Sequence, residues 1–186
     1  MSNELPDLTP SISDAINHLA RQHQFRSEQQ LAAEVTPEQL SVPCQRTWFG
    51  VTTLNQKTNG GDFTACVANV TQEDGVYPWF FLFCRPPGSE SWQPLVSQGG
   101  ERREMVQRVP GKVRVPRTCI CIGGLGVVPN GGRIQIEMED GSVHEDHAVG
   151  GCCIAMAPLT VPTEDQGTIT VRFSDADGNE LQSETV

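Results

Sequence analysis

Long hydrophobic runs are missing from the sequence, and their absence excludes a membrane-spanning helix. The longest apolar run, Trp79 to Cys84, has the length of a strand, whereas a helix that crosses a bilayer needs roughly 20 apolar residues. The first ten residues, MSNELPDLTP, contain neither the basic region nor the apolar core of a secretory signal. We therefore expect a cytoplasmic protein that does not enter a membrane.

Basic residues are also scarce. The chain has 13 Lys and Arg against 23 Asp and Glu, a net charge of −10 at pH 7. Such a chain repels phosphate backbones and anionic lipid surfaces, so we expect neither a nucleic-acid nor a membrane partner. The spacing SEQQLAAEV at 27–35 is superficially that of a helix-turn-helix. Residues 1–40 carry six acids against two arginines, however, which is the wrong charge for a recognition helix.

Catalytic motifs are absent as well. There is no G-x-S-x-G elbow, no familiar Cys-His pair and no glycine-rich phosphate loop that precedes a helix. The stretch GGLG at 123–126 follows an apolar segment but leads into Val-Val-Pro. With only four histidines, acid–base chemistry would depend on carboxylates that the sequence does not pair. We expect a non-enzymatic protein without a cofactor.

Glycine and proline, by contrast, are plentiful, with 18 and 13 residues in the chain, which favours short strands and turns. The clearest hairpin lies at 131–158. Its first strand alternates apolar and polar residues from Arg133 to Glu139, and Asp140-Gly141 fits a two-residue type I′ turn. That turn pairs Met138 with Val143, Ile136 with Glu145 and Ile134 with His147. With these pairs, Glu145 and His147 would lie on the same face of the hairpin as the apolar residues of the first strand. We therefore expect either a bulge near Asp146 that shifts the register or the end of the core there. A functional His-carboxylate cluster is the alternative.

The rest of the chain after residue 41 reads as further strands with turns between them. Val76 to Cys84 is apolar on both faces, as expected of a central strand covered on both sides. We predict a mainly β fold, an antiparallel Ig-like β-sandwich over residues 42–186 preceded by a helical N-terminal arm over residues 1–41. The other strands are expected at 48–54, 63–70, 92–96, 119–122, 133–139, 142–149, 152–157, 169–173 and from 181.

The N-terminal arm has clear helix signals. Thr9 is suited to an N-cap and Pro10 to the first helical position, and an apolar stripe then runs to a predicted end near Gln24. A second short helix is expected from Ser27, and Thr36 to Gln39 repeats a capping signature. The stripe docks either on the β body or on a partner. Its residues are Ile12, Ala15, Ile16, Leu19 and Ala20.

Two stretches in the C-terminal half, IQIEMEDGSVHEDHAVGGCCIAMAP and ITVRFSDADGNEL, combine strand alternation with turn residues. On these patterns, residues 110–186 resemble accessory Ig-like β-sandwich domains of uncharacterised bacterial proteins. The resemblance implies a fold and no activity. The cysteines in this part of the chain depart from it.

Seven cysteines are many for a chain of this size, and an odd number cannot all form disulfides within the chain. Without a secretory signal we expect reduced thiols that pack as small apolar groups. The alternative is a thiol- or zinc-dependent protein. Its candidate residues are Cys119, Cys121, Cys152, Cys153, His144 and His147. The C-x-x-C pairs of zinc ribbons are absent. Asp175, Asp177 and Asn179 fit a hairpin turn better than a calcium loop.

A basic segment stands out in this acidic chain, with six of the 13 basic residues between positions 102 and 117 and only Glu104 opposing them. It is either a solvated strand face, a dock for the acidic arm or a partner site. Our first hypothesis is a non-enzymatic interaction or structural protein that binds a protein partner or itself. Its candidate contact residues are Arg102, Arg103, Arg108, Lys112, Arg114 and Arg117 in the basic segment, with Ile12, Ile16 and Leu19 in the arm.

Overall fold

The computed structural model describes residues 4–22, 34–51, 61–99, 113–115, 119–125, 128, 131–149, 152–158 and 167–185. These residues form one helix, one 3-10 turn and eleven strands. The elements are α1 (Thr9–Arg21), η1 (Pro37–Gln39), β1 (Leu40–Val51), β2 (Gly61–Gln72), β3 (Gly75–Arg85), β4 (Gln93–Gly99), β5 (Val113–Val115), β6 (Cys119–Leu125), β7 (Arg133–Glu137), β8 (Val143–His147), β9 (Cys152–Pro158), β10 (Thr170–Ser174) and β11 (Glu180–Thr185). No helix in this part of the chain is long and apolar enough to cross a membrane.

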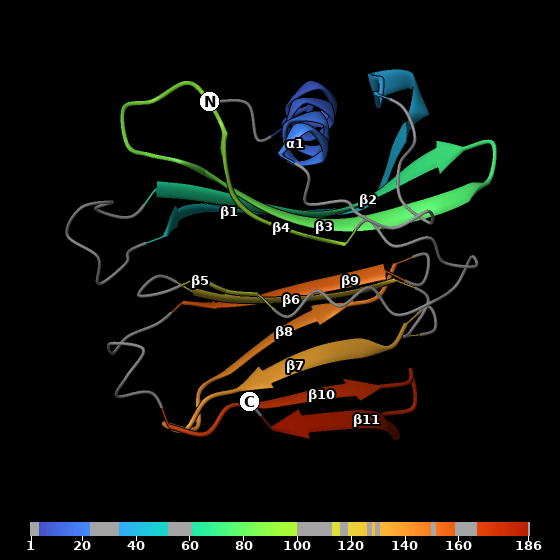
Figure 1. Ribbon diagram of the computed structural model, residues 1–186. Helices are drawn as coiled ribbons and strands as arrows, with labels where there is room; N and C mark the ends of the chain where they lie inside the picture. Colours follow the sequence, from blue (N-terminus) through green and yellow to red (C-terminus); the bar gives the residue numbers. More distant parts are fainter. Residues whose placement is uncertain are drawn as a thin grey trace.

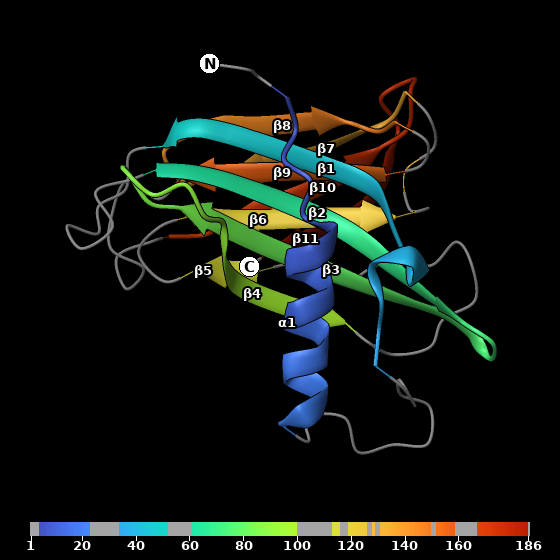
Figure 2. The same cartoon turned by 90° about the horizontal axis from the view of Figure 1, so that it is seen from above.

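The strands build three antiparallel sheets. Sheet A has the order β1-β2-β3-β4, sheet B the order β5-β6-β9, and sheet C the order β11-β10-β7-β8. Figure 1 shows α1 above sheet A, sheet B below it and sheet C lowest, and Figure 2 shows α1 lying across the outer face of sheet A. The predicted mainly β class with an N-terminal helix is confirmed. The described strands form two four-stranded sheets with a three-stranded sheet between them (Figure 1).

Strand β9 explains the third layer, because both of its faces are apolar and buried. Ile154 and Met156 pack against Phe63, Phe80 and other residues of sheet A. The alternate residues Cys153, Ala155 and Ala157 pack instead against sheet C, with its buried isoleucines and Phe173. Since neighbouring side chains of a strand point to opposite faces, one strand fills two cores. Sheets A and C are therefore held together through sheet B.

The other face of sheet A is covered by α1. Ile12 and Ile16 are fully buried against a stacked aromatic row on β3, formed by Trp79, Phe81 and Phe83. Complete burial of one isoleucine side chain contributes about 1.5–3 kcal/mol. Strand β3 is thus covered on both sides, as its unbroken apolar sequence predicts, and the apolar stripe of the arm lies on the chain's own sheet.

Polar side chains fix the helix to the backbone of Val35, just before η1 and within the same arm. Asn17 donates to the carbonyl of Val35 (2.8 Å) and accepts from the N–H of the same residue (2.7 Å). The hydroxyl of Ser13 also donates to this carbonyl (2.6 Å). Ser13 and Asn17 are both buried, so these bonds satisfy groups that water does not reach.

The limits of the arm's elements differ slightly from the prediction. The N-cap is Leu8 rather than Thr9, and α1 ends at Arg21, three residues before Gln24. The predicted capping signature is confirmed, because the N–H of Thr36 donates to the side-chain oxygen of Gln39 at 2.9 Å. The second helix predicted from Ser27 lies outside the described residues.

The predicted register of the β7–β8 hairpin is wrong by one residue. The loop contains three residues, 139–141: the N–H of Gly141 donates to the carbonyl of Met138, and the N–H of Met138 to the carbonyl of Ser142, both at 2.9 Å. Gly141 has φ +81°, the left-handed position of a three-residue loop with a bulge. The extra residue is therefore in the turn and not near Asp146. The observed pairs are Glu137–Val143, Ile136–His144 and Ile134–Asp146.

The residues that were compared with a calcium-binding loop, Asp175, Asp177 and Asn179, lie in the turn between β10 and β11. The carboxylate of Asp175 accepts from the N–H groups of Asp177 (3.0 Å) and Asn179 (2.8 Å) and from the Asn179 amide (2.9 Å). Hydrogen bonding to Asn179 lowers the pKa of Asp175. Its oxygens thus serve the turn, as the sequence interpretation expected.

Candidate functional site

One edge strand from each sheet lies on the same side of the molecule: β1 of sheet A, β9 of sheet B and β8 of sheet C. A groove of about 930 Å³ runs between them. It is lined by residues 46–49 and 51 of β1, residues 143–146 of β8 and residues 154–156 of β9. This volume lies within the usual range of binding pockets.

A single carboxylate connects the three edge strands. Asp146 on β8 accepts from Nε of Arg46 on β1, at 3.2 Å to Oδ1 and 3.1 Å to Oδ2. Its Oδ2 also accepts the backbone N–H of Ile154 on β9 at 3.0 Å. The Arg46 and Asp146 side chains are 33% and 20% exposed, so solvent weakens their attraction only in part.

We call the bonds of Asp146 to Arg46 and to the N–H of Ile154 the clamp. The clamp accounts for the polar residues on the inner face of the β7–β8 hairpin. His144 and Asp146 share rows with the buried Ile136 and Ile134, but β8 is the last strand of its sheet. A charge that points inward from an edge strand prevents further strands from pairing indiscriminately. Strand β1 is modified in a comparable way, by two register shifts and by Gly50 with φ +64°.

The walls of the groove carry exposed apolar side chains. Phe49 on β1 and Val143 on β8 are among the residues that line the groove, and each is 51% exposed. Ile154 and Met156 on β9 are buried and form its floor. The lining therefore combines apolar side chains with polar ones, among them Glu145 and the Arg46–Asp146 pair.

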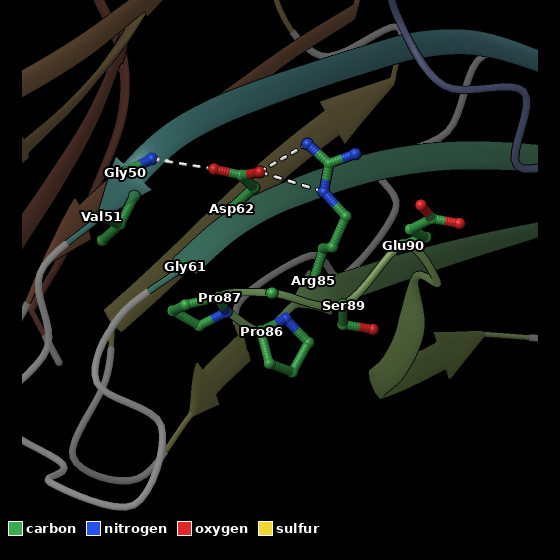
Figure 3. A pocket seen from close by; sticks show the side chains of 10 residues that line it. Gly50, Val51, Gly61, Asp62, Arg85, Pro86, Pro87, Ser89 and Glu90 are labelled. Carbon is green, nitrogen blue, oxygen red and sulfur yellow. Dashed lines mark hydrogen bonds and ion pairs between the residues drawn. The ribbon is translucent and has the colours of Figure 1, made fainter.

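A second, smaller pocket of about 550 Å³ lies where β1 ends, β2 begins and β3 ends, and Figure 3 shows it from close by. Arg85 donates to Asp62 at 2.6 Å and 3.0 Å, and Asp62 accepts the N–H of Gly50 at 2.9 Å. Burial raises the pKa of Asp62, but the hydrogen bonds from Arg85 and Gly50 and the Arg85 charge outweigh it and lower the pKa overall. The guanidinium also lies 4.9 Å from the Trp92 ring centre. These charges satisfy each other and fix the bulge at Gly50.

The residues predicted to contact a partner are distributed as follows. In the arm, Ile12 and Ile16 are buried on sheet A and Leu19 is partly buried beside them. In the basic segment, Arg114 lies in β5, and its side chain is outside the described set. The other basic residues, Arg102, Arg103, Arg108, Lys112 and Arg117, lie outside the described residues.

The strand register separates the two cysteine pairs of the zinc hypothesis. In sheet B, Cys121 pairs with Met156, whereas Cys153 pairs with Gly124. Three residues of strand, about 10 Å, therefore separate Cys121 from the position opposite Cys153. His144 is half-buried and His147 exposed, in agreement with their predicted opposite faces. Within the described part of the chain, no group of three or more His, Cys, Asp or Glu is placed to hold a metal.

Four of the described cysteines, Cys44, Cys66, Cys84 and Cys153, are thiols that form no disulfide. Burial raises the pKa of Cys66 to about 12, with a smaller contribution from Cys44, and burial also raises the pKa of Cys84. A raised pKa keeps a thiol protonated and weakly nucleophilic. The expected role of such thiols as apolar packing groups fits Cys66, which is buried under α1.

Sequence reasoning did not find the groove, because Arg46 and Asp146 are 100 residues apart. The one signal was the charge on the apolar side of the predicted hairpin, which here belongs to the clamp. Compared with protein-family models, curated proteins and solved structures, the chain matches none.

Proposed function

We propose that this protein is a non-enzymatic interaction protein, and that it binds a segment of a partner protein in the groove between β1, β8 and β9. The observation that carries the proposal is the groove itself, where three sheet edges meet and where Phe49 and Val143 expose half of their surface. Exposed apolar side chains beside a concave surface are typical of binding sites. The assignment of residues 110–186 to accessory Ig-like domains, which carry no activity, is part of the same proposal.

Self-association is the second candidate, and it would require the helical arm to move. Ile12 and Ile16 have no exposed surface, so assembly through them requires α1 to leave its own sheet and to dock on that of a second copy. Exchange of an identical element between copies is a known route to dimers. The basic segment 102–117 would supply further contacts to acidic surfaces of the second copy.

Selection from a random peptide library displayed on phage tests the groove without a known partner. The matched variants are Phe49→Asp in the groove and Leu181→Asp on β11, because both remove a side chain that is about half exposed. We expect the unaltered chain and Leu181→Asp to enrich the same sequences, and Phe49→Asp to lose them. Thermal unfolding of both variants checks that they fold.

Two results would contradict the proposal: enrichment of no sequence by the unaltered chain, or equal retention of its selected peptides by Phe49→Asp. Native mass spectrometry of the same samples reports the number of subunits and so tests self-association separately. A dimer that disappears when Ile12 and Ile16 are both changed to Ser, in a variant that still unfolds cooperatively, would favour exchange of the arm.

A further inference from the structure

We propose that the partner segment carries a basic side chain, an arginine or a lysine, next to an apolar one, and that the basic head pairs with Glu145 at the rim of the groove. This inference rests on the proposed function and adds the chemistry of the partner. It uses exposed side chains of β1 and β8 and not the backbone of β9, because residues 153–157 of β9 are at most 5% exposed.

Strand β8 places an apolar side chain beside a carboxylate. Val143 and Glu145 lie on the same face of the strand, because side chains two residues apart point to the same side, and their Cα atoms are about 7 Å apart. Val143 is 51% exposed, and Glu145 is exposed as well. Both residues line the groove. A partner side chain can therefore reach the two together.

The carboxylate of Glu145 is not matched by a cation in the described part of the chain. Its side-chain partner there is the neutral amide of Gln135, at 2.9 Å. The arginines of β1, β7 and β10 bond to other groups: Arg46 to Asp146, Arg133 to Ser174, and Arg172 to Glu137 and Glu180. The charge of Glu145 is thus available to a cation that a partner brings.

The surroundings of β8 also favour a basic partner. The described parts of sheet C and its turns, residues 133–147 and 167–185, contain nine acidic residues against two arginines, a net charge of −7 without the histidines. The field on this side of the molecule is therefore negative. Such a field accelerates encounter with basic segments and repels acidic ones.

The shape of a basic side chain suits this part of the groove. The hydrocarbon stem of an arginine or lysine can lie on Val143 while its charged head reaches Glu145. Arginine is the better fit, because its guanidinium is more weakly hydrated and donates in a fixed fork. The neighbouring apolar side chain of the partner would cover Phe49, which is 51% exposed. The apolar contacts then supply most of the affinity, since an exposed ion pair contributes little, and the charge selects the partner.

The first test repeats the library selection with Glu145→Lys and with the matched charge reversal Glu73→Lys. Glu73 is also exposed and lies in the β2–β3 turn, near the start of β1, whereas the groove lies at its end. We expect the unaltered chain and Glu73→Lys to enrich peptides with Arg or Lys beside an apolar residue. Glu145→Lys should enrich Asp or Glu at that position instead, because like charges are rejected. Thermal unfolding verifies that both variants fold.

The second test measures whether the two charges are in contact. The most enriched arginine peptide is labelled, and its binding is followed by fluorescence anisotropy beside the same peptide with citrulline, which keeps the shape of arginine without its charge. Both peptides are titrated with the unaltered chain and with Glu145→Gln. Each change alone should weaken binding by about threefold to tenfold, and the two together by no more than either alone, because they remove one shared interaction.

Different failures have different meanings. Three results would overturn the inference and leave the proposed function standing: Phe49-dependent peptides without an excess of Arg or Lys, the same peptides from Glu145→Lys, or fold-changes that multiply in the second test. Enrichment of no sequence by the unaltered chain would contradict both. If a peptide of residues 112–117, KVRVPR, displaces the selected peptides and native mass spectrometry shows oligomers that Phe49→Asp removes, the occupant is a second copy and the separate partner is refuted.

Discussion

Replacement of Asp146 by alanine should destabilise the fold more than the loss of one surface ion pair. Asp146 bonds both Arg46 and the backbone N–H of Ile154, and Ile154 has no exposed surface. A buried N–H left without an acceptor costs about 1–3 kcal/mol. Loss of the partly exposed ion pair adds up to about 1 kcal/mol. We therefore expect the free energy of unfolding to fall by about 2–4 kcal/mol, with the low end if water enters the groove.

Two further variants separate these contributions. Asp146→Asn keeps an oxygen acceptor for Ile154 and removes only the charge, so it should cost about 1 kcal/mol. Glu145→Ala, next to it on the exposed face of β8, should cost no more than about 0.5 kcal/mol. The expected order of destabilisation is Asp146→Ala, then Asp146→Asn, then Glu145→Ala.

Urea unfolding followed by tryptophan fluorescence measures this order, provided that the dependence on denaturant is the same for each variant. For a chain of this length the alanine variant should melt about 4–16 °C lower. Equal stability of Asp146→Ala and Glu145→Ala would refute the reasoning, because it would mean that the carboxylate does not connect the three edge strands.

Three other predictions concern the arm and the thiols. Asn17→Ala should lower the free energy of unfolding by about 2–3 kcal/mol, because it leaves the N–H and the carbonyl of Val35 with one hydrogen bond fewer each. Urea unfolding measures this beside the control Asp14→Ala, at an exposed position of the same helix, and equal stabilities of the two variants would contradict it. Between pH 9 and about 12 the free energy of unfolding should decline, because the unfolded state releases the Cys66 proton while the folded state retains it. Urea unfolding at several pH values should show a smaller decline for Cys66→Ala, and an equal decline in both proteins would exclude Cys66 as the cause. Native mass spectrometry of protein purified without chelator should give the mass of the reduced chain without metal, whereas a metal that chelator removes, with loss of folding, would favour the zinc hypothesis.

The sequence predicts strands and helix well where local periodicity decides them. The alternation from Arg133 to Glu137 and the stripe from Ile12 to Leu19 both give the observed element. The hairpin register failed, because Asp140-Gly141 is compatible with both a two-residue and a three-residue loop, and one residue more shifts every pair.

Features that depend on distant residues could not be predicted in this way. The sequence marks β9 as a buried strand but does not state which two surfaces bury it. The clamp requires β1 and β8 to lie next to each other, and no local pattern in either strand encodes this. The groove could therefore be located only once the three sheets were placed.

The double burial of β9 has a consequence for synthesis on the ribosome. Strands β1 to β4 form a continuous meander that ends at Gly99, and this part can pair as soon as it leaves the exit tunnel. Strand β9, whose Ile154 and Met156 pack on one apolar face of this meander, starts only at Cys152. At 5–20 residues per second, the roughly fifty residues between them take about 3–10 s to make. During that interval Phe63, Phe80 and Leu82 lack their contacts with Ile154 and Met156, so this core is completed only after most of the chain has been made.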